Sequence, residues 1–264
     1  MTITEMIMRV TNPVFQRIGL KLVKDWSTWD AFVSLEGMSQ REIINRLVWL
    51  KEHLNFTPSS SIDVGASNGL WALPFLKIFP ETQMLMVEPL EDHKPKLEEI
   101  TWKYPKVVYR QALLGESDQI VRFNEFGYKS SLFGNATGEG FGQVHQRQMT
   151  TLDKIIEELS FPPPELVKLD VEGAELSVLK GALKALKSAE IVEMEVSLLP
   201  FKKDLPLLDD VVTFMAANGF RVFDCFGIYG RPLDGMPVQG ECLFIRKDSR
   251  LISNYRWADG LTWS

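Results

Sequence analysis

Apolar residues recur at helical spacing through the first 56 residues of the chain. Two breaks are expected in this stretch, at Asn12-Pro13 and at Glu36-Gly37, because proline and glycine interrupt helices. The pattern predicts an N-terminal helical extension over residues 1–56. Its apolar positions are Ile7, Val10, Val14, Ile18, Leu22, Ile43, Ile44, Leu47, Leu50 and Leu54.

After a polar boundary at residues 57–60, short apolar runs alternate with longer amphipathic runs. The short runs predict strands and the longer runs predict helices. This alternation is typical of an α/β fold with a mostly parallel sheet and helices on both faces. The expected strands are 61–64, 83–88, 106–111, 119–126 (leaning antiparallel), 143–150 (extended), 166–169, 190–196, 220–226 and 241–246, and the expected helices are 70–79, 91–103, 151–159, 173–187 and 207–218.

Two segments interrupt or follow this alternation. Residues 127–142 hold five glycines and predict a long loop, and long loops in compact domains tend to be functional or mobile. The tail over 249–264 is rich in aromatic residues. We expect it to fold back over the site or into a contact between subunits, so a homo-oligomer is one expectation.

The composition argues against several classes of protein. A net charge of −6 over 264 residues argues against a general nucleic-acid binder, which normally carries a basic face. The chain starts without the features of a signal peptide, and no apolar run reaches the roughly 20 residues of a membrane helix. Cys225 and Cys242 lack metal-binding spacing, so we expect two reduced, buried thiols in a cytoplasmic protein.

The loop after the first expected strand reads Asp63-Val64-Gly65-Ala66-Ser67-Asn68-Gly69 and leads directly into a helix. Its glycines allow a ligand to approach closely, and the free N–H groups of the helix suit an anionic group. The dinucleotide pattern G-x-G-x-x-G fails here, because Ser67 and Leu70 replace its second and third glycines. No Lys-Ser/Thr of a phosphate-binding loop follows. The carboxylate of Asp63 favours a cationic ligand, and a turn that only joins strand to helix is the alternative.

Glu88-Pro89 ends the second expected strand. An acidic residue about 20 residues beyond such a loop can accept hydrogen bonds from both hydroxyls of a ribose. We favour this role over that of an exposed acid at a strand end. Ala112, after the third strand, could pass beside a bound purine.

Carboxylates also follow the later strands. Asp170, Glu172 and Glu175 come after the fourth strand of the alternation, and Glu195 lies at the end of the next one. Glu175 is expected to cap or flank the following helix. The other acids could do general acid/base work or bind Mg²⁺ through their oxygens.

The chain has three histidines. His145 could act as a general base near neutral pH, and an exposed strand position is the alternative. His53 and His93 lie in charged, helical surroundings and are expected at the surface.

Together these segments resemble the FkbM family of methyltransferases. Their order and spacing cover about residues 60 to 246. One departure is Ser67, where the family pattern usually has asparagine, and serine keeps a small polar side chain there. The matching segments are 62–69, 87–89, 130–132, 151–153, 167–175 and 179–181.

The resemblance implies a class I methyltransferase domain over 57–248, with a seven-stranded sheet whose last strand is antiparallel. It also implies methyl transfer from S-adenosylmethionine, usually to a hydroxyl oxygen of a sugar, glycolipid or polyketide-type product. The cofactor-binding residues that it implies are Asp63, Gly65, Ala66 and Asn68, with Ser67 and Gly69 in the same loop, at the methionine and sulfonium end; Glu88, with Pro89, at the ribose; Asp170 at the methionine amine or the reacting centre; and Ser130 and Ser131 at the edge of the pocket.

Transfer to a hydroxyl requires that its proton leaves as the oxygen attacks the methyl group. The candidate proton acceptors are Asp170, Glu172, Glu195 and His145. A Mg²⁺ ion held by Asp170 and Glu172 could instead lower the pKa of the acceptor. The expected substrate is a small molecule or a carbohydrate. Two rivals stay open: a nucleotide-dependent oxidoreductase, against which the failed glycine pattern counts, and a non-catalytic cofactor-binding protein.

Overall fold

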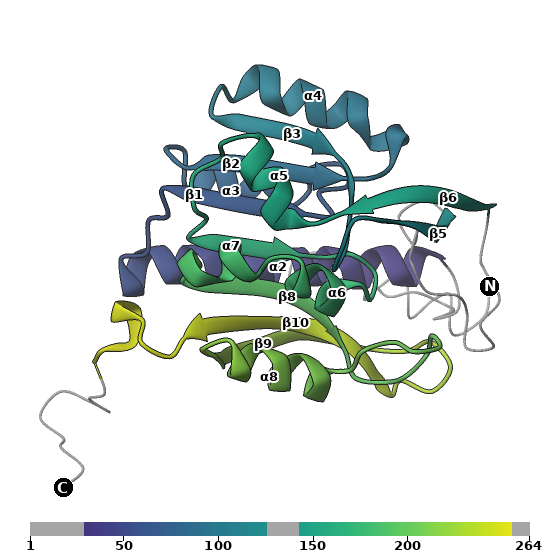
Figure 1. Ribbon diagram of the computed structural model, residues 1–264. Coiled ribbons are helices and arrows are strands. Elements are labelled where there is room, and N and C mark those ends of the chain that lie inside the picture. The colour runs from purple at the N-terminus through teal and green to yellow at the C-terminus, as the bar shows by residue number, and fades with distance from the viewer. Residues whose placement is uncertain (1–28, 126–142, 255–264) are drawn as a thin grey trace, which may run out of the picture.

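The computed structural model describes residues 29–125 and 143–254 (Figure 1). They form a seven-stranded sheet with the order β3-β2-β1-β7-β8-β10-β9. The first five of these strands are parallel, and β10 is antiparallel to both of its neighbours. The predicted mostly parallel sheet with an antiparallel last strand is therefore confirmed. Its strands are β1 (Ser60–Val64), β2 (Gln83–Glu88), β3 (Val107–Gln111), β7 (Leu166–Leu169), β8 (Ile191–Ser197), β9 (Phe220–Gly230) and β10 (Pro237–Arg246).

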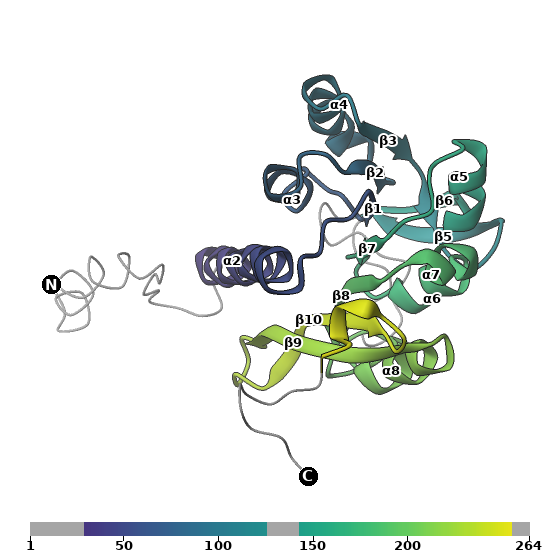
Figure 2. The same ribbon diagram turned by 90° about the vertical axis from the view of Figure 1, so that its left-hand side faces the viewer.

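Helices cover both faces of the sheet, as predicted (Figure 2). The helices α2, α3 and α4 lie on one face, and α5 to α8 lie on the other. Within the described residues, no helix has the length and apolar character needed to cross a membrane. The helices are α2 (Trp29–Leu54), α3 (Ala72–Ile78), α4 (Lys94–Lys103) preceded by the 3-10 turn η1 (Glu91–His93), α5 (Leu152–Glu158), α6 (Glu175–Lys180), α7 (Leu183–Ser188), α8 (Leu208–Ala217) and, after the last strand, the 3-10 turn η2 (Arg250–Ile252).

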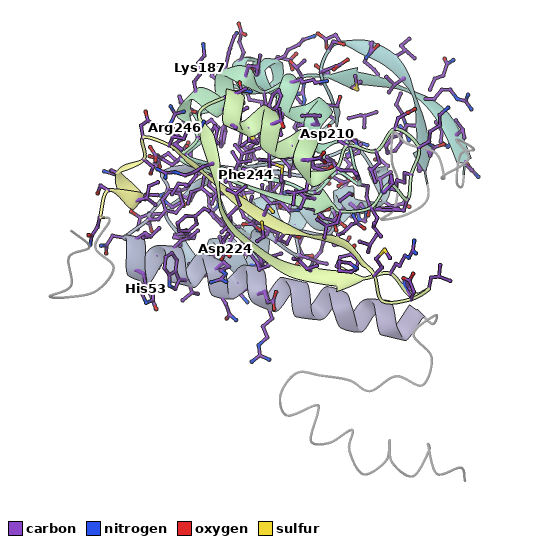
Figure 3. All side chains as sticks on the ribbon, turned by 90° about the horizontal axis from the view of Figure 1, so that it is seen from below. His53, Lys187, Asp210, Asp224, Phe244 and Arg246 are labelled. Carbon is purple, nitrogen blue, oxygen red and sulfur yellow. The ribbon has the colours of Figure 1, made fainter. Side chains whose placement is uncertain are left out.

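Each face of the sheet has its own hydrophobic core. The central strands are buried on both faces, as expected for a parallel sheet between two helical layers. Met215 of α8 and Phe244 of β10 belong to one core, and Figure 3 shows Phe244 in the layer between α8 and α2. Leu47 of α2 and Phe75 of α3 belong to the other. Each such side chain contributes about 1.5–3 kcal/mol when it is fully buried, so both layers stabilise the sheet.

The second half of α2 packs against the sheet. Leu47 and Leu50 are fully buried there. Arg46 Nε lies 2.7 Å from Asp224 Oδ2 of β9, and Figure 3 shows Asp224 on the side of β9 that faces α2. His53 is exposed, as predicted. The helix thus covers one face of the sheet, and the domain boundary near residue 56 stays a prediction.

A second, three-stranded sheet has the order β4-β6-β5 and comprises β4 (Leu113–Leu114), β5 (Gln119–Glu125) and β6 (Gln143–Thr150). The strand predicted at 119–126 is antiparallel, and its partner is the segment predicted as extended at 143–150. The loop predicted between them, the break at Asn12-Pro13 and the folding of the tail over 255–264 fall outside the described residues.

Two predictions near the ends of the chain are corrected. α2 runs through Glu36-Gly37 without a break, because a single glycine costs a helix only about 1 kcal/mol relative to alanine.

Cys242 is buried as predicted, but Cys225 is exposed. Both thiols are free, and they face each other across β9 and β10. Cys225 is exposed because β9 is the edge strand of the sheet.

The single helix predicted over 173–187 is two helices, α6 and α7, which are separated at Gly181. A Cβ atom on Gly181 would lie 2.1 Å from the carbonyl oxygen of Gly115, so the chain passes too close to its neighbour for a larger residue. The carboxylate of Asp153 accepts hydrogen bonds from Lys184 N at 2.8 Å and Ala185 N at 2.9 Å. A side chain from α5 therefore satisfies the free N–H groups at the start of α7.

Candidate functional site

A cavity of about 230 Å³ opens at the carboxyl ends of the central strands. The strand order reverses between β1 and β7, and ligands of open α/β sheets bind at such a switch point. The walls come from the loop after β1, the end of β2, the segment after β7, strands β8 to β10 and helix α2. They are formed by Ile43, Ile44, Val64, Gly65, Ala66, Ser67, Leu70, Trp71, Pro74, Val87, Glu88, Pro89, Leu90, His93, Ala112, Leu113, Leu114, Phe123, Lys168, Asp170, Val171, Glu172, Ala174, Glu195, Tyr229 and Glu241.

The loop after β1 is held between two neighbouring strands. Gly65 N and Ala66 N donate to the carbonyl oxygen of Val87 at 2.9 and 3.2 Å. Gly65 has a φ of +78°, and a Cβ atom there would lie 1.8 Å from the carbonyl oxygen of Asp170. Ser67 also has a positive φ, of +46°. The loop therefore requires a glycine at its first turn, and its backbone lines the cavity directly.

Glu88 connects the end of β2 to this loop. Its side chain is buried, and its two oxygens accept hydrogen bonds from Ser67 N at 2.9 Å and Leu90 N at 3.0 Å. Burial raises the pKa of Glu88, and these two hydrogen bonds oppose that rise. A carboxylate has about four lone-pair sites, so lone pairs remain for hydroxyl groups of a ligand in the cavity.

Asn68 and Gly69 support the loop from behind and do not line the cavity. The Asn68 Oδ1 atom lies 2.8 Å from His93 Nδ1. His93 is partly exposed, as predicted, and it also lines the cavity, which was not predicted. Gly69 has a φ of +75°, and a Cβ atom on it would lie 2.2 Å from Cδ1 of Ile100 in α4. The close packing of α4 on the loop explains this second glycine.

Asp63 is completely buried beneath the loop, behind the cavity wall. Its Oδ1 atom lies 3.5 Å from Lys168 Nζ, and its oxygens accept no hydrogen bond from the described residues. Burial raises the pKa of Asp63, and the charge of Lys168 opposes the rise. Lys168 Nζ is also 3.3 Å from Asp170 Oδ2. The structure thus brings Asp63 to the ammonium group of Lys168, which itself lines the cavity.

Acidic residues form a row across β7, β8 and β10. Leu169 pairs with Met194, and Glu195 pairs with Glu241. Asp170, which follows Leu169, is therefore level with Glu195 and Glu241, and all three line the cavity. Burial is the main cause that raises the pKa values of both glutamates, and the charge of Asp170 raises them further.

Two neighbours hold Glu195 in this row. Gln239 Nε2 donates to its Oε2 atom at 2.5 Å, and the Tyr229 hydroxyl lies 3.3 Å from its Oε1 atom. Glu193, two residues earlier on the same face of β8, is almost fully buried and accepts a hydrogen bond from Trp71 Nε1 at 3.0 Å. Glu193 therefore holds the side chain of Trp71 in the cavity wall, whereas Glu195 lines the cavity itself.

Glu172 follows the row and lines the cavity with a positive φ of +54°. Lys202 Nζ donates to its carbonyl oxygen at 2.9 Å and to its Oε2 atom at 3.1 Å. Glu175 starts α6, and its Oε1 atom accepts from Val171 N at 3.0 Å and Gly173 N at 3.2 Å. Glu175 thus orders the segment between Asp170 and α6, in line with its predicted role beside the helix.

His145 is placed away from these acids. It lies on β6 of the small sheet, half-exposed, with Nε2 3.9 Å from Glu125 Oε2. Its cross-strand partner Phe123 lines the cavity, but His145 does not. The structure therefore does not bring His145 together with Asp170, because β6 pairs with β5 rather than with the large sheet. Among the described residues, no group of three acidic, histidine or cysteine side chains is arranged to hold a metal ion.

The sequence of this region matches a known family model. The model of the methyltransferase FkbM domain matches residues 63–222 of the 264. The chain belongs to the FkbM methyltransferase family. The matched range begins at Asp63 and includes Glu88, Asp170 and Glu195, but it ends before Glu241.

Other proteins are similar to this FkbM-family chain over smaller stretches or at low identity. Hexuronic acid methyltransferase AglP from Haloferax volcanii is 48% identical over 44 residues, which are 17% of this chain and 18% of that protein. The precorrin-6y C5,15-methyltransferase of Geobacter metallireducens GS-15 is 11% identical, with a TM-score of 0.46 over 77% of this chain and 87% of that one. The magnesium protoporphyrin IX methyltransferase (ChlM) of Synechocystis PCC 6803, solved with bound SAM, is 12% identical, with a TM-score of 0.45 over 93% of this chain and 98% of that one.

The chemistry of the cavity lining in this FkbM-family chain suits S-adenosylmethionine, the methyl donor that the resemblance to the family implies. Glu88 keeps lone pairs for ribose hydroxyls, and Leu90 and Phe123 offer apolar surface to a purine. A Cβ atom at position 65 would clash with the carbonyl oxygen of Asp170, so glycine lets the loop backbone itself form the cavity wall. The acidic walls suit a sulfonium cation, because a buried charge requires an opposite charge or a hydrogen bond nearby.

The structure thus sorts the residues that sequence reasoning selected for the FkbM-family site. Those that line the cavity are Gly65, Ala66, Ser67, Glu88, Pro89, Ala112, Asp170, Glu172 and Glu195. Those that lie outside its lining are Asp63, Asn68, Gly69 and His145, and Ser130 and Ser131 fall outside the described residues.

Sequence reasoning gave no role to several residues that line the cavity. Lys168 had a visible signal, because a lysine inside a short apolar strand is rarely buried without a partner. Glu241 had a weaker one, since it precedes the apolar run of the last strand. Tyr229 had none, because its approach to the cavity depends on which strands pair. Trp71 is one of several tryptophans whose side chains could stack on a sugar, and the structure places it in the cavity lining.

Proposed function

We propose that this methyltransferase transfers the methyl group of S-adenosylmethionine to a hydroxyl oxygen of a carbohydrate or another small molecule. The observation that carries the proposal is the row of carboxylates on the wall of the cavity, with Asp170 beside the loop after β1. The name of the Haloferax relative, a hexuronic acid methyltransferase, favours a sugar-containing acceptor, and only the sugar class, not the acid group, is carried over to this chain.

When bound, the cofactor supplies an electrophilic methyl group, and the protein supplies position and charge. Gly65, Ala66 and Ser67 would hold its methionine end by their backbone, and Glu88 would accept hydrogen bonds from its ribose. Asp63 acts through Lys168, which it orients from below. These residues bind and position, and none of them carries the proton of the acceptor.

Asp170 is the residue that we assign to the proton of the acceptor hydroxyl. Its side chain is 44% exposed, whereas Lys168, its partner at 3.3 Å, is almost fully buried. The ammonium group of Lys168 fixes the direction of the Asp170 carboxylate, while the rest of that carboxylate stays open to the cavity. Glu172 is less free to act, because Lys202 holds both its carbonyl and its carboxylate. Glu195 is already hydrogen-bonded by Gln239.

The decisive experiment incubates the protein with methyl-labelled S-adenosylmethionine and an extract of the cells that produce it, and then identifies the labelled product. The expected product is a methyl ether, which withstands mild alkali. Label that mild alkali releases indicates a methyl ester on a carboxyl group. That result, or label on nitrogen or carbon, contradicts methylation of a hydroxyl. Cofactor binding without any labelled product favours the non-catalytic rival.

Two further measurements separate the remaining alternatives. In calorimetry, binding of NADH but not of S-adenosylmethionine would favour the oxidoreductase. The Mg²⁺ alternative at Asp170 and Glu172 predicts that excess EDTA abolishes turnover and that added Mg²⁺ restores it. Proton transfer to Asp170 alone predicts unchanged turnover in EDTA and a loss of at least tenfold in kcat for Asp170→Asn.

A further inference from the structure

Glu241 is a buried carboxylate that opens on the cavity, and no other described residue is its hydrogen-bond partner. Its side chain is only 8% exposed, and it lines the cavity wall. Within the part of the chain that the structure describes, it accepts no hydrogen bond and joins no salt bridge, although the charge of Lys168 acts on it. Buried polar groups in proteins nearly always have a hydrogen-bond partner. A ligand group in the cavity that donates a hydrogen bond to Glu241 would be such a partner.

The strand order places Glu241 at the far end of the cavity from Glu88. Glu88 ends β2, and β1, β7 and β8 lie between β2 and β10. Neighbouring strands are about 4.8 Å apart, so four steps separate the two glutamates by roughly 19 Å. A ribose bound at Glu88 is therefore too distant to contact Glu241. Glu241 lies beyond Asp170 and Glu195 in the row. We call this end of the cavity, away from Glu88, the acceptor half.

The charges of this half do not suit an anion. Three carboxylates of the row line it, and Glu172 lies next to them. Lys168 is the one lysine or arginine among the described lining residues, and it already pairs with Asp63 and Asp170. A negatively charged group would meet the oxygens of four carboxyl groups, of which Glu172 is already paired with Lys202, and no unpaired lysine or arginine within the described lining.

We propose that Glu241, together with Glu195, forms the binding site for the methyl acceptor. This site takes a neutral, hydroxyl-rich acceptor such as an uncharged glycan or polyol. Its hydroxyl groups donate hydrogen bonds to the Glu241 carboxyl group, and the acidic row excludes acceptors with a negative charge next to the methylated hydroxyl. The proposal rests on O-methyl transfer as the function of the cavity.

The first test asks whether Glu241 serves the acceptor or the cofactor, and it requires no turnover. Calorimetry measures the binding of S-adenosylhomocysteine, which lacks the sulfonium charge, to the wild type, Glu241→Gln and Glu88→Gln. We expect Glu241→Gln to bind within twofold of the wild type and Glu88→Gln to bind at least tenfold more weakly. A tenfold loss in Glu241→Gln with an unchanged melting temperature places Glu241 in the cofactor site and overturns the proposal.

The second test measures the charge of the acceptor. The labelled products from the extract are passed over an anion-exchange resin, and the methylated residue is then identified. We expect a methylated residue without negative charge. A carboxylate or phosphate on that same residue overturns the proposal and leaves O-methyl transfer intact. The absence of any labelled product contradicts the proposed function itself, and the acceptor site falls with it.

The third test uses the acceptor identified in this way. Glu241→Gln should raise its KM at least tenfold and leave kcat within threefold, because the residue binds the acceptor and does not take its proton. Glu158→Gln is the matched control, since Glu158 is an exposed partner of Arg110 and is not part of the cavity lining. An unchanged KM in Glu241→Gln, or an equal change in the control, contradicts the proposal.

Discussion

The backbone of Gly65 packs against the carbonyl group of Asp170, so that a Cβ atom on Gly65 would lie 1.8 Å from that oxygen. This contact joins the loop after β1 to the first residue after β7. It brings the backbone that would hold the methionine end of the cofactor next to the carboxylate that we assign to the acceptor proton. The site therefore depends on two strands that are about 100 residues apart in the chain.

Gly65→Ala should weaken cofactor binding strongly. The left-handed conformation alone costs an alanine about 1–2 kcal/mol, and the clash with Asp170 adds to this cost. We expect at least a hundredfold weaker binding of S-adenosylmethionine in calorimetry, together with a lower melting temperature. Gly235→Ala is the control, because Gly235 has a similar φ of +74° with open space around it. Equal losses in the two variants would mean that conformational strain, not the contact with Asp170, explains the effect.

Glu88→Gln should weaken cofactor binding and destabilise the loop. One oxygen would become an NH₂ group that faces the N–H of Ser67 or of Leu90, so two donors would meet. An unsatisfied buried donor costs about 1–3 kcal/mol. We expect at least a tenfold rise in the dissociation constant for S-adenosylmethionine, measured by calorimetry. Glu81→Gln, at an exposed position before β2, should bind normally. Normal binding by Glu88→Gln would remove the ribose role.

Asp153→Ala should destabilise the protein without disturbing the site. Its carboxylate accepts hydrogen bonds from two N–H groups at the start of α7. Loss of such a cap costs about 0.5–2 kcal/mol. Urea unfolding should show this loss, and kcat of the folded enzyme should stay within twofold of the wild type. Glu157→Ala is the control, because Glu157 is largely exposed. A large fall in kcat would show that Asp153 acts on the site as well.

Glu193→Gln should change how stability depends on pH. Burial raises the pKa of Glu193 to about 7, against the opposing charge of Lys168. The folded state therefore keeps a proton that the unfolded state loses at its ordinary, lower pKa. The free energy of unfolding is highest below that lower pKa, and it falls as pH rises towards about 7. The loss is on the order of 3 kcal/mol.

The glutamine variant keeps the acceptor for Trp71 Nε1 and has no proton to lose. Its free energy of unfolding should therefore exceed that of the wild type at about pH 8, and the difference should vanish near pH 4. Urea unfolding at both pH values measures this. The exposed Glu158→Gln should follow the wild type at both. A constant difference between Glu193→Gln and the wild type would show that Glu193 does not titrate in this range.

Local patterns in the sequence were sufficient for much of the fold. The strands 83–88 and 166–169 were predicted to the residue, because each is a short apolar run between turn signals. The loop from Asp63 to Gly69 and the acid at Glu88 were found by the same means. These residues lie within one strand–loop–helix–strand unit, so their positions can be predicted from residues that are close in the sequence. The broken helix at Gly181 was missed, because the contact with Gly115 that requires the glycine comes from a distant segment.

The sequence by itself determined the α/β class and the family, and it pointed to the loop after β1 that we propose for the cofactor. Only the tertiary structure showed that Lys168 joins Asp63 to Asp170, and that Glu241 lies beside Glu195. The physical reason is that β7 pairs with β1, which sets Lys168 opposite Asp63, and that β10 enters the sheet antiparallel between β8 and β9, which sets Glu241 opposite Glu195. Which strands pair depends on long-range packing and not on local spacing. The half of the cavity that we assign to the acceptor is therefore visible only in the folded chain.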